Sequence, residues 1–134
     1  MEIIARYGEN AVEIETLRSQ KARRSNRVNI YANDTKAGII SKLKESCALP
    51  EYLWESWDSL NDCLRDYDDN NEDCLEAVIE CRGEGFSEEQ RIFCACALSA
   101  MKDGQRIRIA VKASGKRDIS DALRCVDEAA AEWD

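Results

Sequence analysis

Four acidic residues recur at helical spacing in the middle of this chain, and carboxylates in such a row attract cations or basic surfaces. They lie within residues 49–67, LPEYLWESWDSLNDCLRDY, and are Glu55, Asp58, Asp62 and Asp66, at intervals of three, four and four. On a helix these intervals place all four side chains along one edge. Like charges four residues apart destabilise a helix by about 0.2–0.5 kcal/mol per pair. Two explanations are open: the edge binds a basic partner, or it is an ordinary solvated face.

An apolar stripe on the opposite side indicates how this helix is positioned. The stripe has intervals of three, four and three, the spacing at which a helix buries one face, and consists of Trp57, Leu60, Leu64 and Tyr67. Ser56 is expected to cap the helix, and Asp58 in the first turn is favoured by the helix dipole. Asp62 and Asp66 have no such local explanation, and for them both explanations stay open.

The same stretch resembles the segment that characterises the barstar family of ribonuclease inhibitors. A Leu-Pro-Glu-Tyr loop is followed by a helix that carries two aspartates four residues apart and ends in Asp-Cys-Leu. The matching positions are Leu49, Pro50, Glu51, Tyr52, Asp58, Leu60, Asp62, Cys63 and Leu64. Members of this family are intracellular proteins that plug the active site of a bacterial ribonuclease.

The resemblance implies that the acidic edge imitates the phosphates of a nucleic acid. Asp58 and Asp62 would pair with arginines and lysines of a ribonuclease active site, while Tyr52 and Trp54 in the preceding loop would cover its catalytic groups. Aromatic anchors beside desolvated charge pairs are typical of tight interfaces. The expected partner-binding residues are Tyr52, Trp54, Glu55, Asp58, Asp62 and Asp66.

Departures from the family pattern indicate a partner other than that of barstar itself. Trp54 and Ser56 stand where the family has a glycine followed by an Asx-like cap. Ser99 stands where barstar has a third acidic contact, near the end of the helix before its last strand. We therefore expect an immunity protein that blocks a basic ribonuclease toxin in competition between bacteria. The alternative is a barstar-like binding module with no nuclease target.

Composition and charge favour a protein partner over a nucleic acid. The formal net charge is -8, and residues 51–89 hold fourteen acidic and two basic side chains. Such a block repels phosphate backbones and attracts basic proteins at rates that fall with added salt. No apolar run reaches the length of a membrane span, and the first residues lack the layout of a signal peptide. We expect a cytoplasmic protein that is monomeric when free.

The residue types argue against an enzyme and against a cofactor. The chain has no histidine, no GxGxxG motif and no Walker-type phosphate loop, which removes histidine-dependent nucleophiles and phosphate cradles. The seven cysteines form no paired CxxC motif and are expected to be reduced and mostly buried. We therefore expect no catalytic residue, no cofactor and no metal.

Residues 66–73, DYDDNNED, imitate a calcium-binding loop without completing it. Asp66, Asp68 and Asn70 fit the first, third and fifth positions. The sixth residue is Asn71 where such loops need glycine, and the twelfth is Ala77 where they need a bidentate glutamate. We expect an acidic turn, and a carboxylate metal site is the weaker alternative.

Strands that alternate with helices predict an α/β fold around these residues. A hairpin is expected within residues 2–17, a helix capped by Asp34 follows the first parallel strand, and a capping box at Ser87 and Gln90 begins a helix that ends at Gly104. The expected parallel strands are 28–32, 75–81 and 106–112. The pattern of residues 75–81 also fits a helix, and the resemblance to the barstar family decides for a strand.

These elements predict a single barstar-like domain over residues 1–134. Its fold class is α/β, with a three-stranded parallel sheet and flanking helices in a core of residues 28–112. Residues 1–27 are expected to be an N-terminal addition, and residues 113–134 to be a C-terminal one with a final helix over 119–133.

Overall fold

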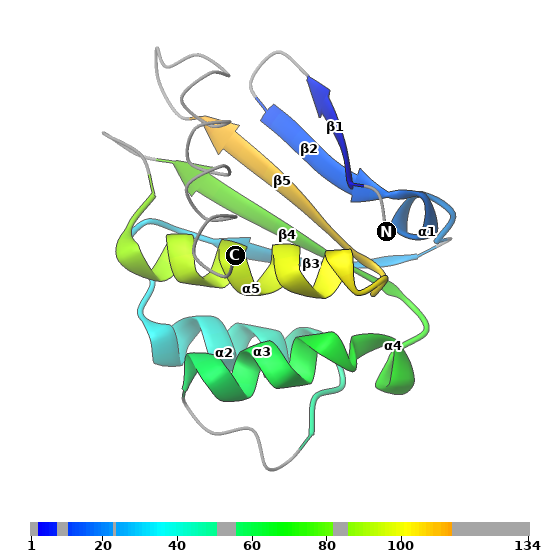
Figure 1. Ribbon diagram of the computed structural model, residues 1–134. Helices are drawn as coiled ribbons and strands as arrows, with labels where there is room; N and C mark the ends of the chain where they lie inside the picture. Colours follow the sequence, from blue (N-terminus) through cyan, green and yellow to red (C-terminus); the bar gives the residue numbers. More distant parts are fainter. Residues whose placement is uncertain (1–2, 8–10, 23, 51–55, 82–85, 114–134) are drawn as a thin grey trace.

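One sheet with helices packed on one of its faces makes up the described part of the protein (Figure 1). The computed structural model describes residues 3–7, 11–22, 24–50, 56–81 and 86–113. The strands in these ranges are β1 (Ile3–Tyr7), β2 (Ala11–Thr16), β3 (Ser25–Ile30), β4 (Cys74–Cys81) and β5 (Ile107–Ala113). The helices are α1 (Leu17–Gln20), α2 (Lys36–Ser46), α3 (Trp57–Arg65), α4 (Tyr67–Asn70) and α5 (Glu88–Lys102).

Strands β3, β4 and β5 form the parallel core that the alternating pattern predicts. β4 lies between the other two, with Glu76 in register with Arg27 on β3 and with Arg108 on β5. The chain crosses from β3 to β4 through α2, α3 and α4, and from β4 to β5 through α5, as parallel pairing requires. The α/β class is confirmed, and residues 75–81 are a strand.

The predicted sheet of three strands is wrong, because the N-terminal hairpin extends it. The described strands form one five-stranded sheet in the order β1-β2-β5-β4-β3. β1 pairs antiparallel with β2, and β2 pairs antiparallel with β5. Without the hairpin, β5 would expose a row of unpaired backbone groups, which pair readily with other chains. The expected hairpin is therefore confirmed, whereas the expected final helix over 119–133 lies outside the described residues.

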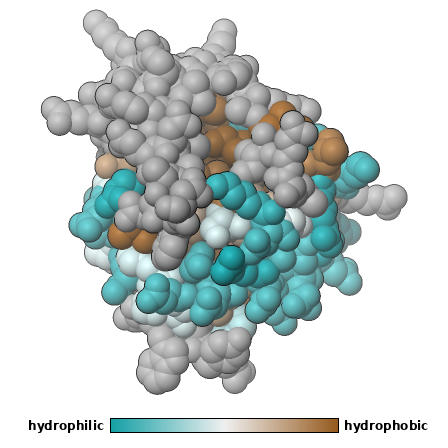
Figure 2. Space-filling view, in the orientation of Figure 1, coloured by the Kyte–Doolittle hydropathy of each residue, from teal (hydrophilic) through white to brown (hydrophobic). Residues whose placement is uncertain are grey.

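The core lies between the sheet and the helices. Alternate residues of the strands face the helices and are buried, among them Val28, Ile30, Ala77, Ile79, Ile107 and Val111. The predicted stripe is confirmed, because Leu60, Leu64 and Tyr67 are fully buried and Trp57 packs against the same cluster. Figure 2 shows that hydrophilic residues dominate the described surface over α2 and α3. None of the helices in the described ranges combines the length and apolar character of a membrane span.

Side-chain caps begin the three long helices. Ser56 caps α3, and Ser87 with Gln90 forms the predicted capping box of α5. Gly104 follows the end of α5 with a φ of 91°, a conformation that glycine adopts without strain.

The predicted cap of α2 by Asp34 is wrong. Thr35 is the cap, since its hydroxyl accepts a hydrogen bond from the Gly38 N–H at 3.1 Å. Asp34 Oδ2 instead accepts from the Tyr31 N–H at 2.8 Å and from Lys42 Nζ at 2.6 Å. The ammonium group of Lys42, in the second turn of α2, therefore binds the Asp34 carboxylate that was expected to cap the helix.

Replacing Leu64 with alanine tests the burial of the α3 stripe. Leu64→Ala is expected to lower the free energy of unfolding by about 2–5 kcal/mol, because it leaves a cavity in the core. Urea unfolding followed by circular dichroism measures this loss. Leu17, whose side chain is 56% exposed, supplies the control, and Leu17→Ala is expected to change stability by less than about 0.5 kcal/mol. Equal losses for the two variants would contradict the described core.

Candidate functional site

Helix α3 presents part of the predicted binding site to solvent. Asp58 and Asp62 lie on α3 and Asp66 is its C-cap, and all three are exposed. Their carboxylates form no ion pair and no side-chain hydrogen bond with any residue in the described ranges. The other predicted residues, Tyr52, Trp54 and Glu55, lie outside the described residues.

A further exposed carboxylate follows the end of α3. The Asp69 N–H donates to the Asp66 carbonyl at 3.1 Å, so the backbone turns on into α4. Asp69 is exposed and follows Asp66 by three residues. Together these residues, which we call the acidic row, are Asp58, Asp62, Asp66 and Asp69. Sequence reasoning missed Asp69 because it assigned residues 66–73 to a turn, although the helical spacing also covers this position.

Helix α5 lies beside α3 and runs in the same direction (Figure 1). Near the start of α3, the Cys96 thiol contacts the Trp57 carbonyl at 4.0 Å. Near its end, Arg65 Nε donates to Asp103 Oδ2 at 2.7 Å. Ser99, between Cys96 and Asp103, is therefore beside the acidic row and is partly exposed. Arg65 is engaged by Asp103, so it does not neutralise the row.

The thiols nearest the acidic row are held in the protonated form. Burial raises the pKa of Cys63, and the charges of Asp62 and Asp66 raise it further. Burial and the charge of Asp58 raise the pKa of Cys96 to about 12. A thiol that stays protonated is a poor nucleophile and a poor metal ligand. In the described part of the chain, no group of three or more cysteine or acidic side chains is placed to hold a metal ion.

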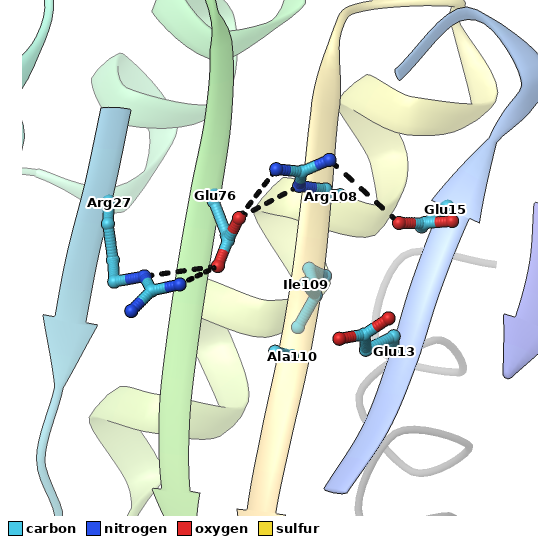
Figure 3. A pocket seen from close by; sticks show the side chains of 7 residues that line it. All are labelled: Glu13, Glu15, Arg27, Glu76, Arg108, Ile109 and Ala110. Carbon is cyan, nitrogen blue, oxygen red and sulfur yellow. Dashed lines mark hydrogen bonds and ion pairs between the residues drawn. The ribbon is translucent and has the colours of Figure 1, made fainter. Parts of the chain in front are cut away.

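A second charged surface occupies the sheet face opposite the described helices (Figure 3). The side chains of Arg27, Glu76, Arg108 and Glu15 lie in one line across β3, β4, β5 and β2, with alternating charge. Glu76 Oε1 accepts from Arg27 Nε at 3.1 Å, and Glu76 Oε2 accepts from Arg108 Nη2 at 2.7 Å. Arg108 Nη1 lies 4.0 Å from Glu15 Oε1. We call this set the charge ladder.

The charge ladder borders a hollow of about 210 Å³ over Ile109 and Ala110. Figure 3 shows the Glu13 carboxylate directed toward the hollow from β2. The members of the ladder are paired with one another, and Glu15 also accepts from Gln20 Nε2 at 3.0 Å. The ladder therefore joins the N-terminal hairpin to the parallel strands. The alternation along each strand can be read from the sequence. The register, which decides which charged residues of neighbouring strands pair, is set only when the sheet forms.

Comparison of the chain with protein-family models, with curated proteins and with solved structures finds no match. A functional interpretation therefore rests on the residues of the chain and their arrangement.

The charge ladder predicts a pH dependence of stability. Burial raises the pKa of Glu76, but the hydrogen bonds and charges of Arg108 and Arg27 outweigh it and hold this pKa below its ordinary value of 4.5. A lowered pKa contributes stability above 4.5 that is lost as pH falls through the folded-state value. Glu76→Gln should cost about 1–3 kcal/mol at neutral pH, and the difference from wild type should shrink steadily below pH 4.5.

Urea unfolding of both proteins across this pH range measures the difference. Glu13→Gln is the control, since Glu13 is an exposed glutamate on the same sheet face and has no ion pair with a described residue. It should leave the pH profile of wild type unchanged. A difference for Glu76→Gln that is constant with pH would contradict the ionic role of this carboxylate.

Proposed function

We propose that this chain is a barstar-like inhibitor that binds and blocks the active site of a basic bacterial ribonuclease toxin. The observation that carries the proposal is the acidic row, because its carboxylates are exposed and form no ion pair with a described residue, and two of them lie on a helix anchored in the core. Consecutive members four residues apart are separated by about 6 Å along the helix axis. Such a row complements the cations with which a ribonuclease active site holds successive phosphates.

The anchoring of α3 prepares the acidic row for binding. The apolar face is buried through Leu60 and Leu64, the first turn is capped by Ser56, and the last turn is tied to α5 through Arg65. A surface that already has its bound shape loses little conformational entropy on association. Binding energy is then available for desolvating the charges at the interface.

Charge distribution supports a basic partner. The net charge of -8 is concentrated in the segment that holds the acidic row. Long-range attraction accelerates encounter with a basic protein and weakens as ionic strength rises. Ser99 places a neutral side chain beside the row, which supports a ribonuclease other than the partner of barstar.

An inhibition assay with purified ribonucleases tests the proposal. Barnase, which is the ribonuclease that barstar inhibits, and a panel of basic bacterial ribonuclease toxins are titrated with the chain. An acidic ribonuclease serves as the negative control. We expect inhibition of at least one basic ribonuclease, with a Kd that rises with added salt. Asp62→Asn should raise this Kd about 30-fold or more, because it leaves a cation of the enzyme unpaired in the interface.

Glu13→Gln is the matched control, because it removes the same charge from the opposite face of the sheet. It should change the Kd less than about threefold, through long-range attraction alone. Binding without inhibition would support the alternative of a barstar-like binding module with no nuclease target. If no basic ribonuclease of the panel binds, the proposal is wrong.

A further inference from the structure

Asp68 lies next to two members of the acidic row but points the opposite way, into the protein. Its Oδ1 accepts from the Arg106 backbone N–H at 2.8 Å and from Arg106 Nε at 3.2 Å. Its backbone N–H donates to Gln105 Oε1 at 2.7 Å. Arg106 also donates to the Asn71 carbonyl at 2.5 Å, just beyond α4. Both ends of α4 are therefore attached to the segment that begins β5.

The other carboxylate oxygen of Asp68, Oδ2, is paired with a residue of the N-terminal segment. Asp68 Oδ2 is buried and accepts no hydrogen bond from a described residue. It forms an ion pair with the guanidinium of Arg18, whose Nη2 lies 2.9 Å away. The Asp68 side chain is 10% exposed. A buried carboxylate oxygen without a cation carries a desolvation cost, which is relieved when the side chain turns toward water.

Movement of Asp68 would affect α4, because this helix is a single turn and the Asp68 carboxylate is one of its contacts with the rest of the domain. It contains four residues and has no side-chain cap. The Tyr67 hydroxyl donates to the Asp73 carbonyl at 2.9 Å, and Asn71 donates to the Ala48 carbonyl at 2.8 Å. These contacts and the buried Tyr67 ring hold the two ends of α4, and the Asp68 carboxylate holds the turn between them.

We propose that Arg18 and Asp68 are positioning residues for the partner-binding surface, and this inference rests on the proposed function. By holding Asp68 inward, Arg18 keeps the neighbouring Asp69 facing solvent beyond the C-terminal end of α3. The N-terminal segment therefore contributes to binding without touching the partner. Asp58, at the far end of the row, lies beyond the reach of this contact.

Hydrogen exchange tests the positioning independently of any partner. Arg18→Met removes the cation and keeps most of the apolar stem. We expect the amides of Asp68 and Asp69 to exchange about tenfold faster in this variant, while amides in the middle of α3, such as Leu64, are unchanged. Arg18→Lys keeps a cation and should restore most of the protection. Unchanged exchange in α4, or equal acceleration in α3 and α4, would overturn the inference.

A pair of double-mutant cycles tests the consequence for binding. The probe is the ribonuclease of the panel that the wild type inhibits most strongly. Asp69→Asn is expected to raise its Kd about fivefold to tenfold in wild type and less than twofold in the Arg18→Met variant. Asp58→Asn should raise the Kd equally in both backgrounds. Equal effects of Asp69→Asn in both backgrounds would also overturn the inference.

The two proposals can fail separately. Accelerated exchange in α4 together with no inhibition of any ribonuclease refutes the proposed function and leaves the structural role of Arg18 in place. Inhibition together with unchanged exchange and additive cycles refutes the positioning role alone.

Discussion

The burial of one face of α3 is the interaction on which the rest of the structure depends. Leu60, Leu64 and the adjoining Tyr67 are fully buried, and a buried side chain of this size contributes about 1.5–3 kcal/mol. Repulsion between aspartates one turn apart costs only about 0.2–0.5 kcal/mol per pair. Packing therefore holds the helix with its carboxylates in water, in spite of their mutual repulsion. Burial of the apolar face of α3 therefore determines where the carboxylates of Asp58 and Asp62 lie.

Charged side chains on the two surfaces differ in whether they are paired within the described protein. On the open face of the sheet, arginines and glutamates are neutralised in register, as Glu76 is by Arg27 and Arg108. On α3, the cation Arg65 is engaged by Asp103 at the end of α5, and within the described ranges the acidic row has no ion pair. Paired charges hold the strands together, whereas unpaired ones that cost stability favour an external partner. This contrast is the main physical support for the proposed binding of a basic enzyme.

The N-terminal segment has two structural effects. Its hairpin pairs with β5 and covers a strand edge that would otherwise expose unpaired backbone groups. Its single-turn helix α1 supplies Arg18, which reaches the inward carboxylate of Asp68. A segment expected from its sequence to be an addition to the domain is thus bonded both to the sheet and to the end of the proposed binding surface.

The sequence by itself determined the features that depend on local periodicity and local hydrogen bonds. The apolar stripe, the caps at Ser56 and Ser87, the strand at β5 and the spacing of Asp58, Asp62 and Asp66 follow from such patterns. Tertiary structure decided the width of the sheet, because strand pairing joins distant segments. It also decided that Thr35 rather than Asp34 caps α2, since Lys42 takes the Asp34 carboxylate. Asp68 and Asp69 are adjacent and chemically identical, yet one turns inward because distant arginines reach it, and the other faces water.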